Sequence, residues 1–104
     1  MDSSFVKVCD LSDLEENRTA EVEANGSRIL VVRVDGSVFA LENICTHDGG
    51  SLGGREVVQG EIECPRHGAK FNVKSGEATQ LPAVADIRTY EVKVESGSVY
   101  VGVG

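Results

Sequence analysis

The sequence predicts a nearly all-β protein built from short antiparallel strands. Three dipeptides suited to tight turns lie between apolar stretches, at Asn25-Gly26, Asp35-Gly36 and Ser96-Gly97. Asn-Gly and Asp-Gly supply the positive φ angles that two-residue hairpins require. Apolar and polar residues alternate around these turns, which is the pattern of strands rather than of helices. We therefore expect three hairpins in an antiparallel β-sandwich.

Two segments next to these turns, from Leu30 to Asp35 and from Tyr90 to Glu95, show the clearest alternation. A period of two places one face of a strand on a core and the other in water, so both are predicted to be half-buried strands. The same pattern occurs earlier in the chain, from Phe5 to Cys9, and again after the last of the three turns. The alternating apolar residues are Leu30, Val32 and Val34, then Tyr90, Val92 and Val94, and finally Val99, Val101 and Val103.

One short segment carries a helical signal. Ser12-Asp13-Leu14-Glu15 matches a capping box, in which the serine and the glutamate satisfy backbone N–H groups at a helix start. It predicts one or two turns of helix; the alternative is a polar connection between strands. Cys9, on the apolar first strand, is interpreted as a small buried hydrophobic residue and is assigned no role.

Length and composition limit the classes of function. A chain of 104 residues suits a single domain, and its formal net charge of -7 argues against binding to nucleic acid or to anionic membranes. Neither an export signal nor a long apolar run is found, so a soluble, cytoplasmic protein is expected. Three cysteines in such a chain indicate metal or redox chemistry rather than a disulfide framework.

The middle of the chain differs from its two ends. Residues 43–83 contain both histidines, both prolines and many glycines, with few continuous apolar runs. Loops carried by a rigid scaffold often hold functional residues. We therefore predict a single domain, 1–104, in which a loop-rich subdomain at about 43–83 is set in a β base formed by 1–42 and 84–104.

Four residues in this segment form two similar ligand pairs. Cys45 and His47 are spaced C-x-H, and Cys64 and His67 are spaced C-x-x-H, which uses every histidine in the chain. Structural zinc sites commonly pair ligands of one type, whereas each loop here offers one thiolate and one imidazole. Such pairs suit two irons bridged by sulfides, with both thiolates on one iron and both imidazoles on the other. This arrangement is a Rieske centre.

The surrounding residues resemble the Rieske ferredoxin family. Its signature is C-x-H followed, after a spacer, by C-P-x-H-G, and the chain reads CTHDGGSLGG and CPRHGAKF at these places. The likeness extends to SGEATQLPA and to the flanking hairpins, and thus covers nearly the whole chain. It implies one 2Fe-2S cluster in a Rieske-type β-sandwich with a cluster-binding subdomain.

Further site residues follow from the ligand chemistry and the resemblance. Gly49, Gly50 and Gly68 allow backbone N–H groups to approach the bridging sulfides, although each also suits an ordinary turn. Pro82 resembles the family's proline loop, which covers the cluster and limits water; the alternative is a plain loop proline.

The sequence predicts an electron carrier rather than an enzyme. Rieske oxygenases use a separate iron held by two histidines and a carboxylate, and both histidines here are committed to the cluster. The resemblance implies a monomer that passes electrons from an NAD(P)H-dependent flavoprotein reductase to a terminal oxygenase of the aromatic-ring dioxygenase type. Three alternatives remain: a ferredoxin for iron-sulfur assembly or another redox pathway, a small subunit of a nitrite-reductase-like complex, and a structural zinc module.

The resemblance also bears on the reduction potential. Histidine ligation leaves the oxidised cluster formally neutral, so its potential should exceed that of an all-cysteine plant-type ferredoxin. High-potential respiratory members carry an extra cysteine in each loop and hydroxyl side chains near the second loop. Gly50, Arg66, Ala69 and Phe71 stand at the corresponding positions here. We therefore expect a potential near the low end of the Rieske range, around -150 mV.

Overall fold

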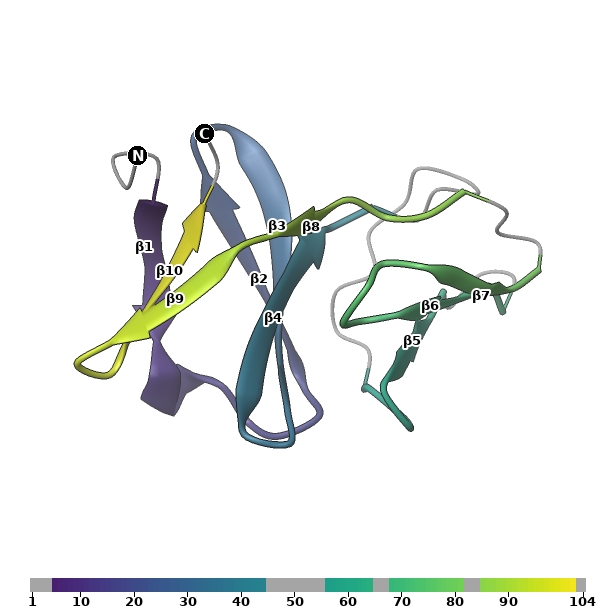
Figure 1. The fold of residues 1–104 in the computed structure, drawn as a ribbon, viewed down its shortest axis with the longest axis horizontal. Helices are drawn as coiled ribbons and strands as arrows, with labels where there is room; N and C mark the ends of the chain where they lie inside the picture. Colours follow the sequence, from purple (N-terminus) through teal and green to yellow (C-terminus); the bar gives the residue numbers. More distant parts are fainter. Residues whose placement is uncertain (1–4, 45–55, 65–67, 82–84, 103–104) are drawn as a thin grey trace.

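The structure, a computed structural model, describes residues 5–44, 56–64, 68–81 and 85–102, and these are nearly all β (Figure 1). They form three antiparallel sheets, which confirms the predicted fold class. In spatial order, the first sheet contains β1 (Phe5–Asp10), β10 (Ser98–Gly102) and β9 (Val92–Glu95). The second contains β2 (Thr19–Ala24), β3 (Ser27–Val34), β4 (Ser37–Glu42) and β8 (Thr89–Tyr90). The third contains β5 (Glu61–Glu63), β6 (Lys70–Asn72) and β7 (Ala78–Gln80).

All three predicted hairpins are present. They join β2 to β3, β3 to β4, and β9 to β10. Both turn residues have positive φ in each: 51° and 81° at Asn25-Gly26, 53° and 78° at Asp35-Gly36, and 50° and 78° at Ser96-Gly97. These values are those of type I′ turns, whose twist matches that of the flanking strands.

The four-stranded sheet lies between two hydrophobic cores. Leu30 and Val32 of β3 pack in a core shared with the third sheet, whereas Ile29 and Val31 pack in a core shared with the first sheet. The prediction that β3 has one face in water was therefore wrong. The run from Ile29 to Val32 is fully buried on both faces, and each such side chain contributes about 1.5–3 kcal/mol of hydrophobic free energy.

The predicted strand from Tyr90 to Glu95 is divided between two sheets. Tyr90 ends β8 and pairs with Ala40 of β4, whereas Val92 starts β9 and pairs with Val101 of β10. Val94, expected on the core face, is 44% exposed. The alternation identified strands here but could not locate the point at which the chain changes sheet (Figure 1).

The predicted helix is a single 3-10 turn, η2 (Leu11–Asp13), that begins earlier than expected. Asp10 is its N-cap, and the Asp10 backbone N–H donates to Asp13 Oδ2 at 3.1 Å, so Ser12 and Glu15 do not form the capping box. None of the described residues belongs to a helix long and apolar enough to cross a membrane.

Candidate metal centre

The second of the two predicted loops, residues 64–69, joins β5 to β6. The Cys64 N–H donates to the Ala69 carbonyl at 2.7 Å, and the Gly68 N–H donates to the Cys64 carbonyl at 3.1 Å. Gly68 has a φ of 78°, a left-handed conformation that glycine adopts without steric cost. The Gly68 N–H is thus hydrogen-bonded within the loop. Gly68 helps to set the shape of the loop through this bond and its left-handed backbone.

Cys64 lies in the core that the second and third sheets share. The residue is fully buried and its thiol is free of any disulfide. Its buried neighbours in that core include Ile62, Phe71 and Val73. An apolar shell around a thiolate ligand limits solvent access and tunes the redox potential of a metal centre. Cys64 and the loop around it therefore fit a buried iron-sulfur cluster.

Hydrogen bonds hold the residues on either side of the other predicted loop, residues 45–55. Before it, the Asn43 N–H donates to the Arg28 carbonyl at 3.0 Å, and the buried Asn43 amide donates to Glu21 Oε1 at 2.8 Å. After it, the Val57 N–H donates to the Asn17 carbonyl at 2.9 Å. Both ends of this loop are therefore fixed to the four-stranded sheet and to the residues that precede it.

The residues on either side of the proline-containing stretch, 81–85, are held in the same way. The Ala78 N–H donates to Asp86 Oδ1 at 3.0 Å, and the Ile87 N–H donates to the Gly76 carbonyl at 2.7 Å. In addition, Gln80 Nε2 donates to the Gly68 carbonyl at 3.0 Å. This last bond connects β7, the strand before the proline-containing stretch, to the loop that contains Cys64.

Only part of the predicted site lies within the described residues. Cys64 and Gly68 are placed as above, and no group of three or more possible metal-binding side chains occurs among the described residues. The other predicted site residues lie outside the described ranges: Cys45, His47, Gly49, Gly50, His67 and Pro82.

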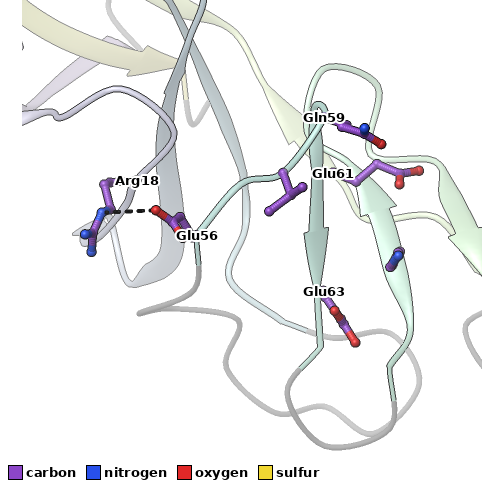
Figure 2. Close-up of a pocket in the computed structure, with 7 residues that line it drawn as sticks. Arg18, Glu56, Gln59, Glu61 and Glu63 are labelled. Carbon is purple, nitrogen blue, oxygen red and sulfur yellow. Dashed lines mark ion pairs between the residues drawn. The ribbon is translucent and has the colours of Figure 1, made fainter.

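A cleft of about 470 Å³ lies beside the β5–β6 hairpin (Figure 2). Its lining includes Glu56, Glu61 and Glu63, together with Arg18 and Lys70. Arg18 Nε lies 3.9 Å from Glu56 Oε2 in an exposed ion pair, a type that adds little stability. Among the residues that the structure describes, no thiol or imidazole lines this cleft. Carboxylates and cations of this kind do not make a site for a soft metal.

Cys9 stands apart from this centre. It is half-buried in β1 and packs against the core between the first and second sheets, so it is less buried than the sequence predicted. Burial raises the pKa of its thiol, and the nearby carboxylates of Asp13 and Asp10 add to this effect. A thiol with a raised pKa is a poor nucleophile at neutral pH.

Two anchoring residues were not identified from the sequence. Asn43 and Gln80 each reach the backbone or side chain of a residue far away in the chain, at Glu21 and Gly68 respectively. Contacts of this kind leave no local sequence pattern. The nearest signal was that Asn43 lies at the boundary between the regular strands and the glycine-rich segment.

Comparison with known families identifies the class of this protein. Residues 4–91 match the family described as Rieske [2Fe-2S] domain, so the chain belongs to that family and carries one Rieske 2Fe-2S cluster. The match confirms the predicted cofactor and fold, and it favours an iron-sulfur cluster over the zinc alternative.

Several of the similar proteins are ferredoxins of about the same length. The chain is 34% identical over 96 residues to the ferredoxin component of naphthalene 1,2-dioxygenase/salicylate 5-hydroxylase systems from Ralstonia sp., covering 92% of each. Among solved structures, it is similar to the ferredoxin of carbazole 1,9a-dioxygenase from Nocardioides aromaticivorans IC177, with a TM-score of 0.93, 33% identity, and coverage of 98% of this chain and 100% of that one. It is also similar to a chain in a complex of reduced oxygenase and oxidised ferredoxin in carbazole 1,9a-dioxygenase, with a TM-score of 0.89, 35% identity, and coverage of 95% and 93%.

Proposed function

We propose that the chain is a one-electron carrier whose cluster is held by Cys45 and Cys64 on one iron and by His47 and His67 on the other. The observation that supports this ligand set most directly is the buried, free thiol of Cys64 in a loop closed by two backbone hydrogen bonds. The bound cluster would supply the one-electron redox chemistry, and the chain would hold it and limit its contact with water.

The other predicted site residues take supporting parts in this proposal. Gly49 and Gly50 would let the backbone of the first loop approach the sulfides, and Gly68 would shape the second loop. Pro82 would lie over the cluster as part of the proline loop. The glycine-rich segment at about 43–83 would thus act as a cluster-binding subdomain on a β base.

The partners in this proposal are a flavoprotein reductase and a terminal oxygenase of the aromatic-ring dioxygenase type. Support comes from the full-length similarity to ferredoxin components and to a chain in an oxygenase–ferredoxin complex. A monomeric carrier working in the cytoplasm would suit this exchange, because it must release one partner before it binds the next. The chain itself would hold no site for an organic substrate.

Reconstitution tests this function. The purified holo-protein is mixed with a flavoprotein reductase, NADH and, in separate assays, the oxygenase components of naphthalene, biphenyl and carbazole systems. We expect product formation by at least one oxygenase to require this protein. If the protein is reduced by the reductase yet supports none of the three oxygenases, the dioxygenase assignment fails, and a ferredoxin serving another redox pathway becomes the better explanation.

A further inference from the structure

One side-chain contact joins the second loop to the strand before the proline-containing stretch. Gln80, the last residue of β7, donates from Nε2 to the carbonyl of Gly68 at 3.0 Å. Gly68 follows His67 directly in the chain. Gln80 lies two residues before Pro82. The contact therefore connects two segments that the proposed site places around the cluster.

The geometry of β7 explains why Gln80 can reach this carbonyl. Lys70 pairs with Gln80, but Phe71 pairs with Ala78, so the register shifts and Thr79 is the extra residue of a β-bulge. Bulges of this kind redirect side chains. Phe71 packs in the core and Ala78 packs against it. Gln80, which pairs with the half-buried Lys70, is exposed and contacts Gly68.

Among the described groups of the second loop, the Gly68 carbonyl accepts a hydrogen bond from a side chain outside the loop. The Gly68 N–H and the Ala69 carbonyl are both used to close the loop onto Cys64. The Gly68 carbonyl is the acceptor for Gln80, and a Cβ on Gly68 would lie only 3.5 Å from Glu63 Oε2 and 4.0 Å from Gln80 Nε2. Gly68 therefore has side chains beside it from two strands, Glu63 of β5 and Gln80 of β7.

We propose that Gln80 is a positioning residue for the cluster: its amide fixes the Gly68 carbonyl and so holds the loop that carries Cys64 and His67 in one arrangement. This inference rests on the proposed ligand set. Because Gln80 is exposed, its hydrogen bond competes with water and has a modest net value. Its loss should loosen the loop without unfolding the domain.

The test compares Gln80→Met, which keeps the length of the side chain but removes the donor, with Gln80→Arg, which retains donors. Gln59→Met is the matched control, because Gln59 is also exposed but lies in the turn before β5. In the holo-proteins, we expect Gln80→Met to release iron to a chelator about two to ten times faster than wild type. Gln80→Arg and Gln59→Met should release it at about the wild-type rate.

Two further measurements separate positioning from general stability. The EPR lines of the reduced, still intact cluster should broaden in Gln80→Met and return to wild-type width in Gln80→Arg, because a loose loop holds its ligands in a range of geometries. Tryptic cleavage after Arg66, measured by mass spectrometry, should also accelerate in Gln80→Met by about two to ten times.

The results distinguish failure of this inference from failure of the ligand set. Wild-type iron-release rates or wild-type EPR lines in Gln80→Met, or equal changes in Gln59→Met, would overturn the positioning role. A wild-type protein with no Rieske spectrum would instead reject the proposed ligands. The cleavage after Arg66 would then still show whether Gln80 holds the loop, since it needs no cluster.

Discussion

Ile87 and Gly76 meet through their backbones: the Ile87 N–H donates to the Gly76 carbonyl at 2.7 Å, and the Ile87 carbonyl occupies the space that a Cβ on Gly76 would need. Gly76 also has a φ of 78°. This contact joins the turn after β6 to the chain just before β8. The proline-containing stretch starts and ends within the segment that the contact closes.

Gly76→Ala should therefore be strongly destabilising. Both the left-handed backbone and the clash with Ile87 oppose a side chain, and we expect a loss of at least about 3 kcal/mol in the free energy of unfolding. Gly26→Ala is the matched control, because Gly26 has a φ of 81° but open space around it; it should cost only about 1–2 kcal/mol. Urea unfolding measures both, and equal losses would contradict the steric account.

Cys9 should be the reactive thiol of the holo-protein, and a slow one. If Cys45 and Cys64 bind iron, iodoacetamide should modify one cysteine per folded chain and three per unfolded chain. Burial raises the pKa of the Cys9 thiol, so at pH 8 its thiolate fraction is smaller than that of a free thiol. Its rate relative to N-acetylcysteine should be low at pH 8 and rise as the pH passes through the raised pKa. A relative rate that does not change with pH would contradict this explanation.

Ala69→Ser should raise the reduction potential. Ala69 is fully buried in the loop that contains Cys64, and a hydroxyl there can donate a hydrogen bond that favours the reduced cluster. A bond worth about 1–2 kcal/mol corresponds to about 40–90 mV for a one-electron couple. Phe71→Tyr adds a hydroxyl to a side chain in the apolar core, so any rise there should come with lost stability.

Protein-film voltammetry measures these potentials. Ala20→Ser is the control, because Ala20 packs against the core on the far side of the four-stranded sheet. The wild-type potential is expected around -150 mV. A wild-type value above zero, or an equal shift in both alanine variants, would show that hydroxyl donors near the second loop do not set the potential.

Partner docking is expected at the proposed imidazole ligands His47 and His67, because an imidazole that binds iron through one nitrogen can present the other at the surface. Arg66 is next to His67 in the chain, so Arg66→Glu should slow electron transfer to at least one partner at every ionic strength. Lys7→Glu makes the same charge change on β1, in the first sheet, and should have little effect. Stopped-flow measurements of electron transfer compare the two, and equal rates with an intact cluster would place docking on another face.

Salt should act on the encounter rather than on the final contact. The chain has a net charge of -7, and raising the ionic strength from about 0.01 to 0.5 M shortens the screening length from about 30 Å to a few Å. Association with a basic partner face should therefore slow, with little change in the reduction potential. A rate independent of salt would exclude long-range steering.

The sequence could predict those parts of the fold that depend on neighbouring residues. Asn25-Gly26 and the other two turn dipeptides are sufficient to define hairpins, because few residues tolerate positive φ. The prediction missed that β3 is buried on both faces. The polar residues Arg33 and Asp35 suggested that one face of this strand lies in water. The unbroken apolar run Ile29 to Val32, however, is typical of a strand between two layers.

The same distinction holds for the site. The spacing of Cys64 and His67, like that of the first pair, is local and predicts ligand chemistry. The contacts that support these loops are not local. Asn43 and Gln80 bond to residues 22 and 12 positions away, and the bulge that directs Gln80 arises from strand pairing. Such contacts became evident only in the folded chain.

The ligand set is tested most directly by the histidine nitrogens themselves. The chain contains only two histidines, so growth on ¹⁵N-histidine labels His47 and His67 and no other side chain. ENDOR spectroscopy of the reduced cluster should detect two strongly coupled ¹⁵N nuclei, in a protein with two irons and two acid-labile sulfides per chain. Absence of coupled ¹⁵N, or zinc without labile sulfide, would contradict the assignment of both imidazoles to one iron of the cluster.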